Sequence, residues 1–193
     1  MMKIGLMGYG KAGKAVANVL ANDPRYQLCW VMRRSSSEQA HLEGQPQIPV
    51  VGLAGLDIGD WLDQHPVDAI VDFSQADSVY LYGQELRRRG IMLVSAISAY
   101  TPQHLDYLRE MGQDTRVMSS PNITLGINFL LLAAKLLRGI APFADVEVVE
   151  QHFREKPEIS GTARKIAETL ELGGDRVTSL RVGGIVGHHE VIF

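Results

Sequence analysis

Three glycines near the amino terminus have the spacing of a dinucleotide-binding turn. Gly8, Gly10 and Gly13 follow a short apolar segment and open a stretch with helical periodicity. In such a turn the glycines permit a tight bend, a close approach of the backbone to a pyrophosphate, and close packing of helix on strand. This strand, turn and helix context favours cofactor binding over a glycine-rich turn that binds no ligand.

Two arginines end the second predicted strand, about 20 residues after the glycines, where the adenosine ribose is bound in such folds. An acidic residue there would favour NADH, but this sequence has Arg33 and Arg34. Two guanidinium groups could hold a 2′-phosphate through charge-assisted, bidentate hydrogen bonds. We therefore predict NADPH as the cofactor and NADH as the alternative. A solvated charge pair at a strand end is the structural explanation that stays open.

A second group of reactive residue types lies between residues 150 and 163. His152 and Lys156 are four residues apart, so in an extended segment both side chains leave the same face. Histidine can donate a proton near neutral pH, and a nearby ammonium attracts an anionic substrate. Ser160 has the residue type of a helix N-cap, and the free N–H groups of Gly161 and Thr162 could bind a carboxylate. A purely structural role for these residues also stays open.

An alternating α/β framework is predicted to position the glycines and arginines. Strands are predicted at 3–7, 26–32, 68–73, 91–95 and 115–119, and helices after the glycines and at 76–89 and 102–111. Strands that alternate with helices form a parallel sheet covered on both faces. Residues 35–49 are polar and predict a surface loop before a short strand at 50–51.

The pattern changes after about Ile123, which predicts two domains, 1–122 and 123–193. The second is a smaller α+β domain with an apolar, largely buried helix at 125–137, a helix at 162–172 and strands at 177–182 and 186–193. An apolar strand at the edge of a sheet exposes unpaired backbone groups. We therefore expect self-association through 177–193, as a symmetric dimer or tetramer.

The composition is that of an ordinary globular protein. The 193 residues are 46% hydrophobic and 21% charged, and the net charge of −3 gives no reason to expect nucleic acid or a membrane surface as a partner. The longest apolar run, 129–134, is far shorter than the roughly 20 residues of a membrane span. With no secretory leader and a single cysteine, Cys29, a cytoplasmic protein is expected. Scattered histidines predict no metal site.

Five blocks of this sequence occur in the order found in the dihydrodipicolinate reductase (4-hydroxy-tetrahydrodipicolinate reductase) family. They are Gly8–Gly13, Asp72–Ser74, Pro121–Gly126, Glu150–Thr162 and Gly184–Val191. The chain resembles this family over essentially its whole length. The resemblance implies a nicotinamide-dependent reductase of lysine and diaminopimelate biosynthesis, with a Rossmann-like cofactor domain and a smaller domain that binds a cyclic dicarboxylate and builds the oligomer. It also implies further strands and a final helix after Phe193, so the second domain is expected to be incomplete.

The resemblance also implies roles for particular residues. His152 and Lys156 become the acid/base pair, Gly161 and Thr162 bind a substrate carboxylate, and Ser160 belongs to the same substrate-binding set. Cofactor contacts are implied at Gly8, Tyr9, Gly10, Lys11, Ala12, Gly13, Arg33, Arg34, Ala96, Ile97, Ser98, Pro121, Asn122, Ile123 and Thr124.

Three departures from the family pattern keep other functions open. Phe153 stands where the family has a second histidine next to the first, and Ala96–Ala99 replaces a Gly-Thr-Thr-Gly turn. The loop before Ser160 lacks the family's Asp-Ala-Pro sequence and is one residue shorter. The alternatives are a non-catalytic NADPH-binding module and a reductase of another carboxylated imine. In a reductase, Phe153 is expected in the substrate site.

Overall fold

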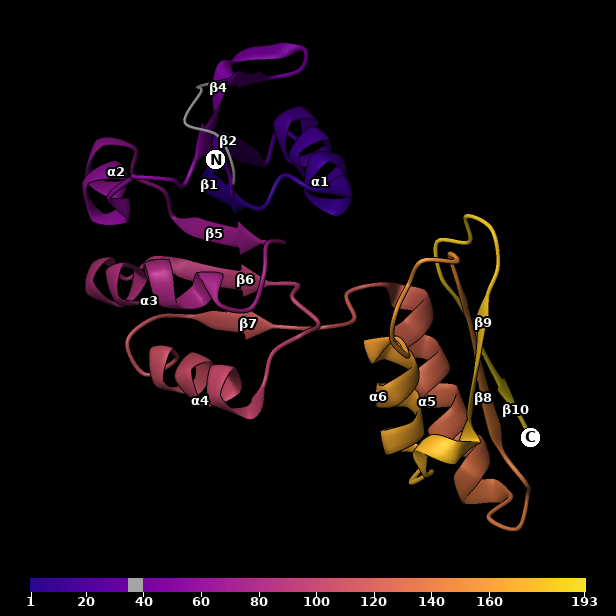
Figure 1. Cartoon of the computed structure of the whole chain (residues 1–193). Coiled ribbons are helices and arrows are strands. Elements are labelled where there is room, and N and C mark those ends of the chain that lie inside the picture. Colours follow the sequence, from indigo (N-terminus) through magenta and orange to yellow (C-terminus); the bar gives the residue numbers. More distant parts are fainter. Residues whose placement is uncertain (35–39) are drawn as a thin grey trace. The chain divides into compact units, whose positions relative to one another are not determined.

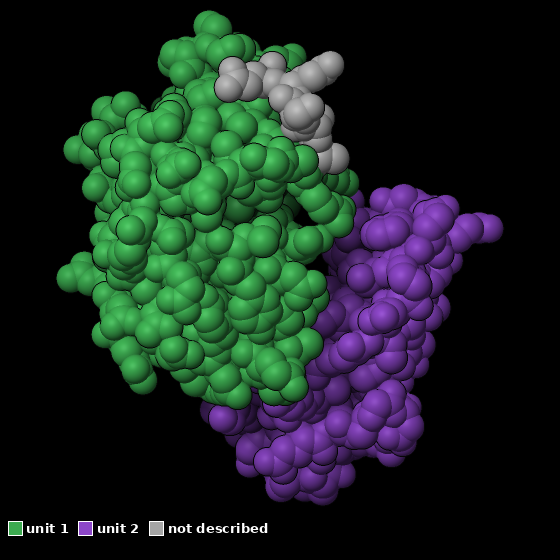
Figure 2. Space-filling model, turned by 60° about the vertical axis from the view of Figure 1, so that its left-hand side comes forward, with its two compact units in different colours: residues 1–120 green, residues 121–193 purple. Residues whose placement is uncertain are grey.

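The computed structural model describes residues 1–34 and 40–193, which form two units (Figure 1). Unit 1 is Met1–Ser120 and unit 2 is Pro121–Phe193, as coloured in Figure 2. The elements of unit 1 are β1 Met2–Met7, α1 Lys11–Asn22, β2 Tyr26–Arg33, β3 Ala40–Leu42, β4 Gln45–Gly52, α2 Ile58–Gln64, β5 Ala69–Asp72, α3 Ser78–Arg89, β6 Met92–Ser95, α4 Pro102–Met111 and β7 Val117–Ser119. Those of unit 2 are α5 Leu125–Ile140, β8 Glu147–His152, α6 Gly161–Thr169, the 3₁₀ turn Gly174–Arg176, β9 Val177–Arg181 and β10 His188–Ile192.

Unit 1 is built on one sheet with the strand order β3-β4-β2-β1-β5-β6-β7. All neighbouring strands are parallel except β3, which runs antiparallel to β4. The order reverses beside β1, because β2 lies on one side of it and β5 on the other. In such sheets ligands bind outside the carboxyl ends of the strands at this reversal. The predicted Rossmann-like parallel sheet is confirmed.

Helices cover both faces of this sheet because successive side chains of a strand point to opposite sides. Ile4 and Leu6 of β1 pack with Ala17 of α1 on one face. Met7 lies on the other face with Trp30 and with buried residues of α2, α3 and α4. Burial on both faces explains why these strands are apolar along most of their length.

The predicted polar loop at 35–49 is wrong for the part of it that the structure describes. Residues 40–52 form a hairpin, in which β3 pairs with β4 and β4 joins the sheet beside β2. The buried side chains of Leu42, Ile48 and Val50 anchor the hairpin in the core on the α1 face. Prolines and glycine obscured this short alternation in the sequence.

Unit 2 has a three-stranded sheet in the order β10-β8-β9, with β8 parallel to β9 and antiparallel to β10. Val148 of β8 packs with Ala134 of α5 and Ile166 of α6 in a core separate from those of unit 1. Strands β9 and β10 are therefore the two edges of this sheet, and the predicted α+β character of unit 2 is confirmed.

Helix α5 is longer and less buried than the sequence predicts. Only Ala134 of the helix is buried, while one face carries large exposed apolar side chains, which Phe143 extends beyond its end. We call this set the α5 stripe: Leu125, Phe129, Leu132, Leu136, Ile140 and Phe143. The helix is apolar on two opposite faces, and unit 2 covers one of them. In the part of the chain that the structure describes, no helix combines the length and apolarity needed to cross a membrane.

Candidate functional site

The three glycines of the turn after β1 have different surroundings: two pack against the protein's own backbone and one borders open space. Gly8 has a φ of +95°, which favours glycine, and a Cβ on it would lie 2.6 Å from the Phe73 carbonyl. A Cβ on Gly13 would lie 2.0 Å from the Gly8 carbonyl oxygen. Gly10, the N-cap of α1, differs because a Cβ there would meet nothing within 4 Å. The chain is therefore open at Gly10, beside the start of a helix whose first N–H groups have no partner within the helix, which is the arrangement that binds a phosphate.

A cavity of about 670 Å³ opens at this turn, beside the carboxyl ends of β1, β2 and β5. Its volume lies within the roughly 300–1,000 Å³ usual for ligand pockets. The lining residues are Gly8, Tyr9, Gly10, Lys14, Met32, Arg33, Arg34, Leu53, Ala54, Phe73, Ser74, Gln75, Ser78 and Leu81. Five of the predicted cofactor residues, Gly8, Tyr9, Gly10, Arg33 and Arg34, are therefore brought together.

The charge of this cavity is positive. Lys14, Arg33 and Arg34 line it, and none of its described lining residues is acidic. Arg34 donates a hydrogen bond to the side-chain oxygen of Gln75, which is neutral. The site therefore suits an anionic ligand with an apolar part, since Leu53, Phe73 and Leu81 supply apolar surface. A phosphorylated dinucleotide fits this donor set.

A buried carboxylate holds the segment that faces Gly8. Asp72, at the end of β5, is fully buried and accepts hydrogen bonds from the Ser74 amide at 2.8 Å, the Ser74 hydroxyl and the Tyr82 hydroxyl. Burial raises the pKa of the Asp72 carboxyl, although these hydrogen bonds oppose the shift. Sequence reasoning missed Phe73, Ser74 and Gln75 as lining residues. Their position directly after the strand next to β1 was the available signal.

The other predicted cofactor residues lie outside the lining of this cavity. Lys11, Ala12 and Gly13 form the first turn of α1, and Ala96, Ile97 and Ser98 follow β6 at the same edge of the sheet. The Ile97 side chain is buried and Ser98 is exposed. Pro121–Thr124 belong to unit 2, where the Asn122 side chain accepts a hydrogen bond from the Thr162 hydroxyl at 2.8 Å.

His152 ends β8 in unit 2 and has a buried carboxylate as its partner. Glu150, two residues earlier, lies on the same face of the strand, and its Oε2 is hydrogen-bonded to Nδ1 of His152. The other oxygen of Glu150 accepts from Ser179 and Arg181, each at 2.6 Å. Burial raises the pKa of the Glu150 carboxyl, but the hydrogen bonds from Arg181, Ser179 and His152 outweigh it and lower that pKa to about 2.

The extended segment expected from His152 to Lys156 is wrong. Strand β8 ends at His152, and a turn at residues 154 and 155 follows, in which the Lys156 amide donates to the Phe153 carbonyl at 3.1 Å. Arg181 holds this turn, because its Nε donates to the Lys156 carbonyl at 3.0 Å. Sequence spacing alone could not place Lys156, and the roles of His152 and Lys156 stay predictions. Phe153 is exposed beside them.

Ser160 caps α6 as its residue type predicts. Its hydroxyl oxygen accepts from the Ala163 amide at 3.0 Å and lies 2.8 Å from Nε2 of His189. The rings of His189 and His152 meet edge to face, with centroids 5.3 Å apart. Gly161 and Thr162 form the first turn of α6, so their N–H groups have no partner within the helix. Sequence reasoning missed Glu150, Arg181 and His189.

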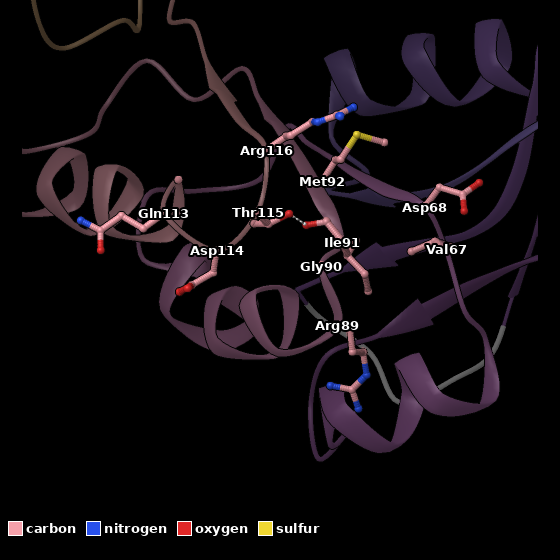
Figure 3. A pocket seen from close by; sticks show the side chains of 11 residues that line it. Val67, Asp68, Arg89, Gly90, Ile91, Met92, Gln113, Asp114, Thr115 and Arg116 are labelled. Carbon is pink, nitrogen blue, oxygen red and sulfur yellow. Dashed lines mark hydrogen bonds between the residues drawn. The ribbon is translucent and has the colours of Figure 1, made fainter.

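A further cavity, of about 610 Å³, lies at the opposite end of the unit 1 sheet (Figure 3). It is lined by the segments that precede β5, β6 and β7, so it is remote from the carboxyl ends of the strands. Several of its polar groups already have partners within unit 1: Thr115 donates to the Ile91 carbonyl, Arg89 binds Asp63 and Asp114 binds Arg87. It resembles a structural groove more than a ligand site. The described residues contain no cluster of metal-ligating side chains.

Two family models together match nearly the whole chain. One is described as "Dihydrodipicolinate reductase, N-terminus" and matches residues 2–123, and the other as "Dihydrodipicolinate reductase, C-terminus" and matches residues 123–193. A 4-hydroxy-tetrahydrodipicolinate reductase of Myxococcus xanthus is 31% identical over 159 residues, which cover 68% of this chain and 58% of that relative. The relative from Listeria welshimeri is 24% identical, and the alignment covers 100% of this chain and 83% of the relative.

Solved structures show the same fold. The dipicolinate-bound dihydrodipicolinate reductase from Paenisporosarcina sp. TG-14 matches with a TM-score of 0.76 at 20% identity, covering 100% of this chain and 83% of that one. An aspartate dehydrogenase from Thermotoga maritima matches with a TM-score of 0.53 at 15% identity, covering 99% and 83%. The chain spans 58% of the length of the relatives from Myxococcus xanthus and Clostridium perfringens.

Proposed function

The chain belongs to the dihydrodipicolinate reductase family, and we propose that it reduces 4-hydroxy-tetrahydrodipicolinate to tetrahydrodipicolinate with NADPH, in lysine and diaminopimelate biosynthesis. The relatives that carry the name of this activity support the proposal. Within this chain, the main observation in support is the cavity at the glycine turn, which Lys14, Arg33 and Arg34 line at the start of α1.

Unit 1 would hold the cofactor. Amide groups at the start of α1 would bind the pyrophosphate, and Arg33 and Arg34 would bind the phosphate on the adenosine ribose. A dihydronicotinamide cofactor, when bound, supplies the hydride for the reduction. Replacement of the 4-hydroxyl of the substrate by hydrogen consumes this hydride and one proton and releases water. The protein must therefore supply or relay that proton.

Unit 2 would hold the substrate and supply the proton. The N–H groups of Gly161 and Thr162 would bind one carboxylate at the start of α6. His152 would donate the proton from Nε2, because its Nδ1 is occupied by Glu150. Lys156 would balance the negative charge of the substrate. Phe153 would line the same site, since it is exposed directly after His152.

The proposal is tested by NADPH oxidation with substrate made freshly by the upstream synthase. Turnover supports it. NADPH binding without turnover would identify a non-catalytic module, and turnover of another carboxylated imine alone would identify a related reductase. His152→Gln should lower kcat by about 10² to 10⁴, the usual contribution of general acid–base catalysis, and leave NADPH affinity unchanged. His41→Gln, an exposed histidine of β3, is the matched control and should have no effect.

Two further proposals accompany this proposed reductase function. We expect a homo-oligomer built through unit 2, supported by the two edge strands of its sheet and by the α5 stripe. We also expect a cytoplasmic location. Cys29, the single cysteine, is a free thiol, and burial raises its pKa.

A further inference from the structure

Glu150 is fully buried in unit 2 and belongs to none of the predicted binding sets. A buried carboxylate is costly unless hydrogen bonds compensate for the lost water. Here Ser179 and Arg181 of β9 donate to Oε1, and the His152 ring binds Oε2. Three groups from two strands therefore converge on one side chain, which is the arrangement of a built site and not of an isolated ion pair.

The ionisation of the Glu150 carboxyl determines which nitrogen of the His152 ring carries hydrogen. With a pKa held at about 2 by Arg181, Ser179 and His152 against the effect of burial, Glu150 is ionised at neutral pH and can only accept hydrogen bonds. The hydrogen between Glu150 and His152 therefore lies on Nδ1. In the neutral ring this leaves Nε2 without a hydrogen, and in the protonated ring Nε2 carries the proton that can be transferred.

Nε2 of His152 lies close to the backbone of Gly187. The ring is largely buried, and a Cβ on Gly187 would lie 3.1 Å from Nε2, so the absence of a side chain there lets the chain pass beside this nitrogen. Besides Glu150, the titratable group that meets the ring is His189, which itself lies within electrostatic reach of His188 and Lys156. Burial and His152 lower the pKa of His189, and the Ser160 hydroxyl can donate to its Nε2, because the Ser160 oxygen already accepts from the Ala163 amide. The fold thus disfavours protonation of His189.

We propose that Glu150 is the positioning residue of His152: it fixes hydrogen on Nδ1 and directs Nε2 toward Gly187. The inference rests on the proposed function of His152 as proton donor. Arg181 supports this arrangement in two ways. It holds Glu150 ionised, and it donates to the Lys156 and Glu158 carbonyls of the following segment. One arginine thereby connects the carboxylate behind His152 with the segment that carries Lys156.

The decisive variant is Glu150→Gln. Arg181 and Ser179 are donors, so the amide oxygen must stay on their side, and the amide NH₂ then faces Nδ1 of His152. Nitrogen-15 NMR of the full chain, at a pH where the ring is neutral, should find hydrogen on Nδ1 in the wild type and on Nε2 in Glu150→Gln. The kcat should fall by at least about 10-fold, as for other carboxylates that fix a catalytic histidine, with little change in substrate KM.

Two further measurements keep the proposal testable. Glu150→Asp retains the charge and should keep hydrogen on Nδ1 with an intermediate kcat, whereas Glu147→Gln, on the same strand and bound to Thr178, should change neither. Hydrogen on Nε2 in the wild type overturns the proposal even if a variant fails to fold, and so does an unchanged kcat in folded Glu150→Gln. A wild type with no turnover refutes the proposed reaction, while the NMR result still tests the position of the hydrogen.

Discussion

The Arg34 guanidinium donates a hydrogen bond of 2.9 Å to the side-chain oxygen of Gln75, which joins the segment after β2 to the segment after β5. These two strands lie on either side of β1, so the contact spans the glycine turn. Because Gln75 is neutral, the bond orients the guanidinium without cancelling its charge. The charge stays available to an anionic ligand in the cavity.

Replacement of Arg33 and Arg34 by alanine should weaken NADPH binding on the order of 10- to 100-fold, since a hydrogen bond to a charged group contributes about 1.5–3 kcal/mol. NADH affinity should change little, because NADH has no ribose phosphate for the arginines to bind. Titrations with both cofactors measure the difference. Arg25→Ala removes an exposed arginine bound to Asp23 and serves as the control. An equal loss for both cofactors would exclude phosphate recognition.

Gly10 and Gly13 should respond differently to alanine. Gly10→Ala places a Cβ in open space and should fold with a near-normal melting temperature, yet weaken NADPH because the Cβ occupies the space for the pyrophosphate. Gly13→Ala places a Cβ 2.0 Å from the Gly8 carbonyl oxygen and should destabilise unit 1 itself. Thermal unfolding with and without NADPH separates the two effects. Normal NADPH affinity in Gly10→Ala would show that the cofactor does not approach there.

The residues predicted to bind the cofactor that line this cavity are found from local signals. Gly8, Gly10 and Arg33 are recognised by spacing along one βαβ unit, whose geometry follows from the alternation of strands and helices. Phe73 and Gln75 enter the cavity only because β5 pairs with β1, and that pairing is a property of the sheet. A contact that depends on which strands are neighbours in the sheet cannot be predicted from the spacing of residues along the chain.

Unit 2 is less predictable for two physical reasons. The turn after His152 is held by hydrogen bonds from Arg181, which lies 25 residues beyond Lys156, so sequence periodicity near His152 cannot reveal it. Helix α5 is apolar on two faces, and its sequence cannot show which of them lacks a neighbour within unit 2. By contrast, the Ser160 cap is a local signal, and the structure confirms it.

Acid should lower the free energy of unfolding of unit 2 over a pH range determined by the titration of Glu150. Its carboxyl has an ordinary pKa of 4.5 and a folded pKa of about 2, so its contribution to the free energy of unfolding is fully present above pH 4.5 and is lost as the pH falls toward 2. Denaturant unfolding at several pH values should show this loss in the wild type. Glu150→Gln, although less stable at pH 7, should lose less stability across the same window. Parallel curves would mean that Glu150 is not held ionised by the fold.

His189 should also make the free energy of unfolding fall with falling pH, but in a higher pH range than Glu150. Burial and His152 lower its pKa from the ordinary 6.5, so the folded state disfavours its protonation and stability falls as the pH drops below about 6.5. His189→Gln should remove this upper step and leave the Glu150 step below pH 4.5 in place. The two variants therefore distinguish the two groups in one series of unfolding curves.

The α5 stripe is a surface that a second copy of this chain could cover. Its six side chains are large, apolar and 65–89% exposed. Monomers rarely expose contiguous apolar patches larger than a few hundred Å², and larger patches mark interaction sites. We expect a second copy to cover the stripe about a two-fold axis, in addition to the contact at 177–193.

Leu132→Glu combined with Leu136→Glu should therefore lower the mass of the assembly, because two buried carboxylates would face their symmetry mates without partners. Ile192→Lys on the edge strand β10 should lower it independently, and the combined variant should be a monomer. Leu105→Glu, a half-exposed leucine of α4 in unit 1, controls for the general effect of an added charge. Light scattering over a wide concentration range measures the mass. A monomeric wild type would refute both contacts, and a mass sensitive only to Ile192→Lys would leave the sheet edge as the single interface.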